Sequence, residues 1–241
     1  MDNNRTDQRE LDQFADVAAQ WWDPRGPMKM LHRINPERLL YIRHQLAPGN
    51  NGAKPFAGMH ILDLGCGAGL VTLPLARLGA EATGLDPTEK AIMAGQQEAA
   101  RQNLNVTFLN QTSDQLAAEG AQFDHAVCLE MLEHVPDPSL ILQDLYALLK
   151  PGGRAVLSTL NRTPKSFAGA IVVAEHVGRF VPRGTHQWKK FIKPTELASM
   201  ARNAGFEVTD QKGLSLDPLR GIFSLSDDLS VNYFMTVEKP A

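Results

Sequence analysis

The sequence predicts an α/β domain in which a mostly parallel sheet of seven strands is flanked by helices. From residue 59 onward, short apolar segments alternate with segments of helical periodicity, a pattern typical of a parallel sheet covered on both faces. A glycine-rich loop follows the first of these strands, and an acid ends the second. We expect a single domain over residues 1–241, because this length accommodates one domain with some additions.

Residues 1–58 are predicted to form a helical cover that precedes the sheet. Apolar side chains recur at helical spacing over residues 7–22, and a segment rich in proline and glycine ends that helix. A second helix is expected over residues 36–46, with Asn35 as its N-cap and Pro36 in its first turn. A Gly/Pro/Asn-rich linker then leads into the sheet.

Residues 59–160 are predicted to hold five strands, and residues 194–241 the C-terminal part of the sheet. The five strands are expected at 60–64, 81–86, 105–109, 124–129 and 153–159. Helices are expected from the glycine loop to about 78, and at 89–102, 113–119 and 139–149. After an interruption over 161–193, the expected elements are a helix at 194–204 and closing strands at 206–209 and 230–238.

Composition and charge exclude several classes of function. The chain has 24 Lys and Arg residues and 27 Asp and Glu residues, a formal net charge of −3. This near balance provides no field that attracts a polyanion, so we expect no nucleic-acid partner. Two cysteines cannot make a disulfide framework, which indicates a reducing compartment. Without a signal peptide or an apolar run of roughly 20 residues, the sequence predicts a cytoplasmic protein.

The loop after the first strand carries the most specific functional pattern. Its sequence is Asp63-Leu64-Gly65-Cys66-Gly67-Ala68-Gly69. Glycines there allow sharp turns and let a ligand approach a backbone that has no β-carbon. Residue 70 is leucine, so the dinucleotide pattern G-x-G-x-x-G fails. Asp86 ends the second strand, where an acid accepts hydrogen bonds from a ribose diol.

An acid-led G-x-G-x-G loop with such an acid resembles the class I methyltransferases, which have a Rossmann-like fold and use S-adenosylmethionine. That cofactor has a free ribose diol and no pyrophosphate, which fits the missing third glycine. The resemblance implies cofactor contacts by Asp63, Gly65, Gly67, Gly69 and Asp86. The alternative is that Asp63 caps a turn and that Asp86 only begins a turn with the proline that follows it.

Three groups that can bind a proton or a metal follow the fourth strand: Glu130, Glu133 and His134. Ligands of open α/β sheets bind outside the carboxyl ends of the strands, so this segment is expected to border the active site. Removing the proton of a phenol, whose pKa is about 10, suits His134 as a general base. A divalent ion, Mg or Zn, held by all three groups is a second hypothesis. The alternative is that His134 caps the next helix and Glu130 is a buried, hydrogen-bonded acid.

The segment after the fourth strand lacks the Asn/Asp-Pro-Pro-aromatic motif, which disfavours nucleobase and protein amide acceptors.

Further motifs are similar to those of the ubiquinone biosynthesis O-methyltransferase family. The resemblance covers about residues 14–234. It is carried by segments 21–23, 31–38, 62–67, 130–138, 158–162, 184–192 and 231–233.

The resemblance implies O-methylation of a polyprenyl catechol-type intermediate and of 3-demethylubiquinol. It also implies cofactor contacts at Arg38, Gly65, Asp86 and Leu129, and a divalent-metal site at the three groups after the fourth strand. Residues 59–160 are then the cofactor-binding core, and the pathway's other enzymes are candidate partners. The alternatives are C-methylation of a quinone ring, O-methylation of a soluble catechol, and a cofactor-binding scaffold without turnover.

Residues 161–193 are predicted to form a lid or interfacial insertion. Its apolar stretch, 166–174, is too short to span a membrane. Basic residues flank this stretch: Arg162, Lys165, Arg179, Arg183, Lys189 and Lys190. The pattern suits a helix at an anionic membrane surface, or a lid helix packed on the sheet. Each CH₂ of a polyprenyl tail favours burial by roughly 0.8 kcal/mol, so we expect peripheral association with the inner face of the membrane.

Overall fold

The computed structural model describes residues 5–167, 188–217 and 219–241. Up to the third strand, the elements are α1 (Gln8–Val17), the short 3-10 helix η1 (Ala18–Gln20), α2 (Lys29–Leu46), β1 (His60–Leu64), α3 (Thr72–Arg77), β2 (Glu81–Leu85), α4 (Glu89–Arg101) and β3 (Thr107–Leu109). Then follow α5 (Ser113–Ala118), β4 (Phe123–Leu129), the 3-10 helix η2 (Leu132–His134), α6 (Pro138–Leu148) and β5 (Leu149–Leu160). The last elements are η3 (Trp188–Lys190), α8 (Pro194–Asn203), β6 (Glu207–Asp217), β7 (Ile222–Ser226) and β8 (Asn232–Glu238).

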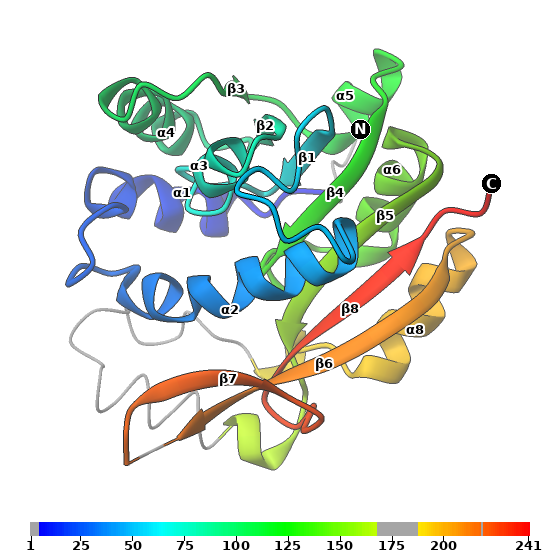
Figure 1. The fold of residues 1–241 in the computed structure, drawn as a ribbon. Coiled ribbons are helices and arrows are strands. Elements are labelled where there is room, and N and C mark those ends of the chain that lie inside the picture. Colours follow the sequence, from blue (N-terminus) through cyan, green and yellow to red (C-terminus); the bar gives the residue numbers. More distant parts are fainter. Residues whose placement is uncertain (1–4, 168–187, 218) are drawn as a thin grey trace.

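The strands form one mixed sheet in the order β3-β2-β1-β4-β5-β8-β6-β7 (Figure 1). The first five strands pair in parallel, as predicted, and β8, β6 and β7 pair antiparallel. The strand order reverses between β1 and β4, so the chain leaves these neighbouring strands toward opposite sides. Their carboxyl ends therefore border an open crevice, which is where ligands bind in such sheets.

The sheet has eight described strands rather than the seven predicted, because β6 and β7 form a hairpin. The prediction ended a strand at Thr209, whereas β6 continues to Asp217 and returns as β7. Residues 209–213 of β6 are Thr, Asp, Gln, Lys and Gly, so no apolar side chain continues the strand pattern there, and most residues of both strands are partly buried or exposed.

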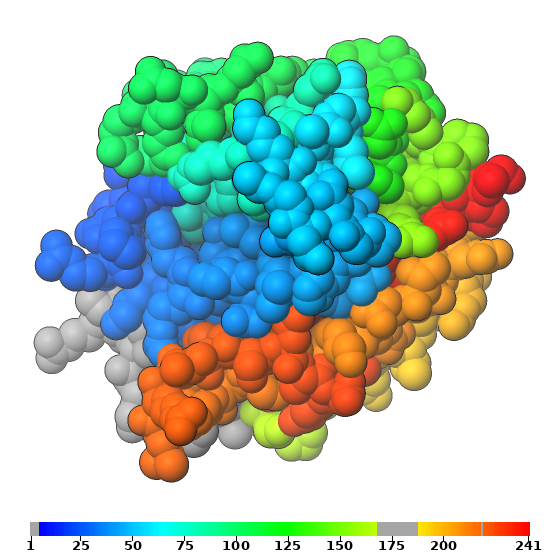
Figure 2. Space-filling view, in the orientation of Figure 1, coloured from blue at the N-terminus to red at the C-terminus, as the bar shows by residue number. Residues whose placement is uncertain are grey.

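Alternate residues of the central strands pack on opposite faces of the sheet. Val127 of β4, Val156 of β5 and Phe234 of β8 pack toward α2 and α3. Their successors, Cys128, Leu157 and Met235, pack toward α6 and α8. In Figure 1, α2 crosses in front of the sheet and α6 and α8 lie behind it. Figure 2 shows α2 as a band between the part of the chain that contains α3 and α4 and the β6–β7 hairpin.

Helix α2 begins at Lys29, so the predicted start at Pro36 is wrong. Pro36 lies inside the helix, where it has no N–H to donate to the preceding turn. Asn35, the predicted cap, instead donates its side-chain Nδ2 to the backbone oxygen of Leu70, 2.8 Å away. A contact across the fold thus replaces the local capping bond that the sequence suggested.

The insertion between β5 and α8 is described only at its two ends. The predicted interfacial stretch over 166–174 and most of the segment 161–193 lie outside the described residues. In the parts of the chain that are described, no helix combines the length and the apolar character needed to cross a membrane.

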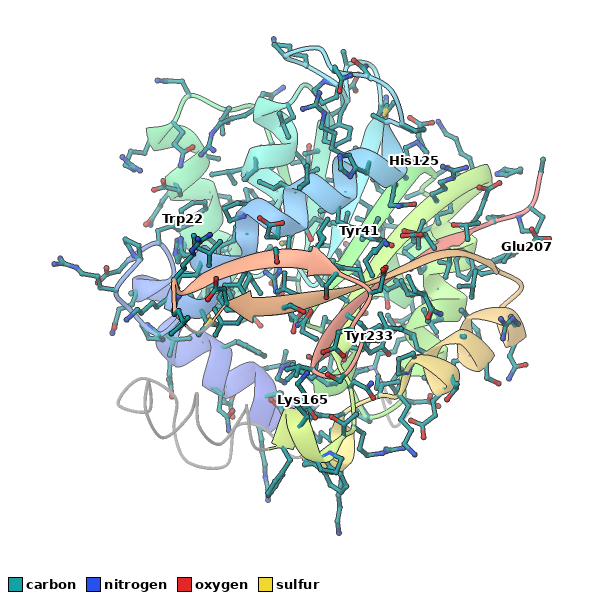
Figure 3. All side chains as sticks on the ribbon, turned by 60° about the horizontal axis from the view of Figure 1, so that its bottom comes forward. Trp22, Tyr41, His125, Lys165, Glu207 and Tyr233 are labelled. Carbon is teal, nitrogen blue, oxygen red and sulfur yellow. The ribbon has the colours of Figure 1, made fainter. Side chains whose placement is uncertain are left out.

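Tyr41 attaches α2 to the sheet. Its ring stacks on Phe234 of β8, with 4.9 Å between the centroids, and its hydroxyl donates to Asp210 of β6 over 2.8 Å. The same hydroxyl lies 2.9 Å from Thr236 Oγ1, at a position that is fully buried (Tyr41 is labelled in Figure 3). Burial raises the pKa of Tyr41 well above its usual value, so the hydroxyl stays protonated and can donate.

We expect Tyr41→Phe to lower the free energy of unfolding by about 1–2 kcal/mol, because Thr236 loses a buried partner and Asp210 loses a donor. Urea denaturation of the purified variant measures this change. Tyr146→Phe is the matched control, since the Tyr146 hydroxyl makes no hydrogen bond with any described residue and that change is expected to stay within about 0.5 kcal/mol. Equal effects of the two substitutions would contradict the anchoring role.

Candidate active site

The glycine loop after β1 adopts backbone conformations that favour glycine. Gly65, Gly67 and Gly69 have φ angles of +75°, +52° and +83°, all in the left-handed region. A β-carbon on Gly67 would lie 2.2 Å from Cζ2 of Trp21, and one on Gly65 would lie 2.5 Å from Cγ of Met131. A β-carbon on Gly69 would instead meet Leu73 and Phe108. The first two glycines thus make room at the crevice, and the third makes room for the core.

The segment between α1 and α2 closes over this loop. Trp22, labelled in Figure 3, donates its indole Nε1 to the backbone oxygen of Ala68 at 3.0 Å. Trp21 is buried against the loop, and its own Nε1 has no hydrogen-bond partner among the described residues. A buried indole N–H without a partner is costly, which makes it a candidate donor to a ligand.

Asp86 and Asp63 occupy the two sides of the loop. Asp86 Oδ2 accepts the backbone N–H of Gly67 at 2.9 Å, and its Oδ1 accepts that of Thr88 at 2.8 Å. Each of these oxygens keeps further acceptor capacity. Asp63 is buried at the end of β1, and its Oδ2 accepts the hydroxyl of Thr72 at 2.5 Å. Burial raises the pKa of Asp63 to about 6 and also raises that of Asp86.

Arg38 places a guanidinium at the end of the crevice. It projects from α2, is only 3% exposed, and has its Nη2 atom 3.5 Å from Oε1 of Glu130. This is an ion pair rather than a hydrogen bond, and neither Nε nor Nη2 has a hydrogen-bond partner among the described residues. Burial lowers the pKa of Arg38, while the negative charge of Glu130 raises it. Two unsatisfied, positively charged donors fit an anionic ligand such as a carboxylate.

Glu130 lies directly after β4 with a φ angle of +52°, one of two described non-glycine residues with positive φ. Its backbone N–H donates to the backbone oxygen of Ser158, and its Oε1 accepts the Ser158 hydroxyl at 2.7 Å. The same Oε1 accepts Nδ2 of Asn232 at 3.0 Å. The strained turn therefore directs Glu130 toward β5 and β8, where its carboxylate is held by several partners.

His134 has a hydrogen-bond partner that the sequence did not single out. Its Nδ1 lies 2.9 Å from Oε2 of Glu10 on α1, and the ring of Phe14 meets it edge-on at 5.2 Å. Burial lowers the pKa of His134, but the hydrogen bond to Glu10 and the nearby carboxylates raise it more, so the net shift is upward. The alternative, that His134 caps the next helix, is wrong, because Asp137 accepts the N–H of Ser139 there.

One weak feature of the sequence could have pointed to Glu10. It lies four residues before Phe14 and thus on the same helix face, which packs inward. A charged side chain on such a face is rarely buried without partners. Nothing in the sequence indicated which residue it meets.

The geometry does not support the predicted metal site at Glu130, Glu133 and His134. Glu133 turns away to accept the hydroxyl of Thr159 at 2.8 Å, while the other two groups bind the separate partners described above. Burial raises the pKa of Glu133 to about 7. Within the described ranges, no three His, Cys, Asp or Glu side chains are arranged to hold a metal ion. The guanidinium of Arg38, beside Glu130, already provides the positive charge there.

Most of the predicted site residues line one cavity beneath the N-terminal segment. Those that line it are Arg38, Asp63, Gly65, Gly67, Asp86, Leu129, Glu130 and His134. Gly69 and Glu133 do not. A second cavity, lined by Glu10, Thr88 and Gln111, shares Asp86 and His134 with the first. Gln111 Nε2 is a further buried donor without a hydrogen-bond partner among the described residues. The two cavities therefore adjoin each other and share part of their lining.

Comparisons with known proteins show which family this chain belongs to. A family model described as a methyltransferase domain matches residues 30–211. A ubiquinone biosynthesis O-methyltransferase from Ruegeria pomeroyi is 45% identical over 242 residues, which cover 98% of each chain. One from Dinoroseobacter shibae is 46% identical over 240 residues, covering 98% of this chain and 97% of the relative. The chain belongs to the ubiquinone biosynthesis O-methyltransferase family. It is an S-adenosylmethionine-dependent methyltransferase.

Solved structures share the fold of this methyltransferase. Magnesium protoporphyrin IX methyltransferase from Synechocystis, with bound S-adenosylhomocysteine, has a TM-score of 0.61 and 22% identity, covering 87% of this chain and 83% of its own. A possible histamine N-methyltransferase from Thermotoga maritima has a TM-score of 0.64 and 20% identity, covering 96% and 98%. The predicted Rossmann-like fold and the predicted cofactor are thereby confirmed, whereas the roles of single residues stay predictions.

Substituting Gly67 by alanine is expected to displace Trp21 and weaken binding of S-adenosylhomocysteine, because the new methyl group would overlap the indole. Isothermal titration calorimetry measures the affinity. Gly49→Ala is the matched control, since Gly49 has a φ of +76° but a β-carbon added there would meet no described atom within 4 Å. In both variants the alanine must adopt a left-handed backbone conformation, which lowers the free energy of unfolding by about 1–2 kcal/mol. Unchanged affinity in both would contradict a cofactor site at this loop.

Proposed function

We propose that this methyltransferase transfers the methyl group of S-adenosylmethionine to a phenolic hydroxyl of polyprenylated intermediates of ubiquinone synthesis, a catechol-type phenol and 3-demethylubiquinol. The names of relatives about 45% identical over nearly the whole chain support this substrate class. The structural observation that carries the proposal is the position of His134, which borders both cavities of the candidate cofactor site. A base at this position suits an acceptor that must lose a proton.

In this proposal the cofactor lies along the two cavities. Arg38, with two unsatisfied donors, binds the carboxylate of the methionine part. Asp86 binds the ribose diol, and the glycine loop at Gly65 and Gly67 lets the backbone approach the cofactor. Leu129, 8% exposed at the end of β4, provides an apolar contact. Asp63 orders the loop through its hydrogen bond with Thr72.

In this proposal the protein's own residues orient the two reactants and remove one proton from the phenol. The phenol O–H proton passes to His134, the phenolate oxygen forms a bond to the methyl carbon, and the bond between carbon and sulfur breaks. The sulfonium thereby becomes a neutral thioether, and no other reactant is needed. Because the pKa of His134 is raised, its imidazole is a better proton acceptor than a free histidine. Holding the two reactants in line contributes much of the remaining acceleration.

Arg38→Met is expected to weaken S-adenosylhomocysteine binding by about 10- to 100-fold, the loss expected when hydrogen bonds to a charged group disappear. Calorimetry with 5′-methylthioadenosine, which lacks the amino-acid carboxylate, is the internal control and should show no such loss. Equal losses for the two ligands would instead indicate that Arg38 supports the fold of the site, through Glu130, without binding the carboxylate.

The acceptor is tested with labelled cofactor and a short-chain polyprenyl catechol. We expect an O-methyl product, identified by mass spectrometry and NMR, and a kcat about 10²- to 10⁴-fold lower for His134→Ala with cofactor affinity retained. A ring C-methyl product would favour C-methylation of a quinone ring. Preference for a catechol without a tail would favour a soluble substrate. Cofactor binding without transfer, unaffected by His134→Ala, would favour a scaffold.

We also propose peripheral contact with an anionic membrane beside the insertion. Phe167 and Trp188, at the two described ends of the insertion, are 48% and 37% exposed, and their rings meet edge-on at 6.0 Å. Two of the neighbouring basic residues give the membrane contact little support, because their charges are already paired. Arg162 pairs with Glu196, and Lys165 (labelled in Figure 3) pairs with Asp228. The aromatic pair therefore carries the proposal.

Replacing both Phe167 and Trp188 by serine is expected to reduce flotation with vesicles that contain an anionic phospholipid, because exposed aromatic rings favour the membrane interface. Met93→Ser is the control, since Met93 is 51% exposed on α4, away from the insertion in the sequence. Undiminished flotation of the double variant would contradict the membrane contact at this pair.

A further inference from the structure

Glu10 connects three segments that are far apart in the sequence. Glu10 is 8% exposed, although it belongs to an N-terminal helix that is otherwise partly exposed. Oε2 lies 2.9 Å from Nδ1 of His134, and Oε1 accepts Nζ of Lys190 at 2.9 Å. Lys190 also lies 3.4 Å from Asp7. The two oxygens of Glu10 thus have different cationic or proton-donating partners, which hold the carboxylate in one orientation.

Resting on the proposed O-methylation, we propose that Glu10 is a positioning residue that holds the proton of His134 on Nδ1, so that Nε2 accepts the proton of the phenol. An ionised carboxylate can only accept a hydrogen bond, so the ring nitrogen facing it must carry the hydrogen. A neutral imidazole with hydrogen on Nδ1 has its lone pair on Nε2. The contact therefore selects one of the two tautomers available to a free histidine.

The surroundings of Glu10 keep it ionised. Burial favours the protonated acid, but the hydrogen bonds from His134 and Lys190, together with their positive charges, lower the pKa of Glu10 to about 2. The carboxylate is therefore negative at neutral pH, as the tautomer argument requires. Once His134 has accepted a proton, the same negative charge lies beside the imidazolium and stabilises it.

Two contacts on α1 fix the orientation of the His134 ring. Glu10 holds the Nδ1 edge, and the edge-on contact with Phe14, one turn later on α1, limits rotation of the ring. Lys190 belongs to η3, in the C-terminal end of the insertion, so the bond from Lys190 to Glu10 joins that end of the insertion to α1. Without this second partner the carboxylate could rotate away from His134.

Glu10→Gln tests the proposal, because glutamine retains the size of the side chain and removes its charge. We expect kcat for the polyprenyl catechol to fall about 10- to 100-fold, less than removal of the base itself. The affinity for S-adenosylhomocysteine is expected to be unchanged. Glu98→Gln is the matched control, since Glu98 is also 8% exposed and ion-paired, with Arg101 on α4, and should retain kcat. Equal kcat values for the wild type and Glu10→Gln would overturn the proposal.

The tautomer itself can be measured on the wild-type protein, which keeps the proposal testable if Glu10→Gln fails to fold. Long-range ¹H–¹⁵N spectra, with His134 assigned by comparison with His134→Gln, are expected to show hydrogen on Nδ1 of the neutral ring. Hydrogen on Nε2 would overturn the proposal. If the wild type transfers no methyl group to oxygen, the proposed function fails, whereas the tautomer measurement still decides the state of the Glu10–His134 pair.

Discussion

A buried positive charge, the guanidinium of Arg38, is the group on which the arrangement of the site depends. An unpaired charge away from water costs several kcal/mol, so the fold must bring negative groups to it. It does so with the carboxylate of Glu130, at 3.5 Å, and with the more distant charges of Asp63 and Glu133. These acids come from the ends of β1 and β4 and from η2. The ion pair therefore joins α2 to the crevice where the strand order reverses.

The N-terminal segment is accordingly part of the site and not only its cover. Trp21 and Trp22 close over the glycine loop, Arg38 enters the crevice, and Glu10 reaches His134 from the other side. Burial of Trp21, Arg38 and Glu10 strengthens these electrostatic contacts, because the local dielectric constant is lower than in water. Burial within the protein likewise raises the pKa values of the acids Asp63 and Glu133. Fold stability and the chemistry of the site therefore depend on the same contacts.

The sequence was most informative where a structure follows from neighbouring residues. The parallel strands, the glycine loop and Asp86 could be placed correctly because periodicity and backbone freedom are local properties. The predicted start of α2 was wrong. Asn35 donates to Leu70 across the fold instead of capping the helix, and Pro36 lies inside the helix. The hairpin of β6 and β7 was missed because residues 209–213 of β6 carry no apolar side chain that would continue the strand pattern. The metal hypothesis assumed that three nearby groups converge, whereas Glu133 turns toward Thr159.

The sequence by itself determined the α/β fold class, the position of the glycine loop and the family, since local patterning and motif spacing carry all three. Only the tertiary structure decided how the polar groups are paired. Glu10 lies 124 residues before His134 and 180 before Lys190, and no rule of local spacing relates such positions. Burial alone forces these groups together, because each polar atom removed from water must find a partner inside the fold.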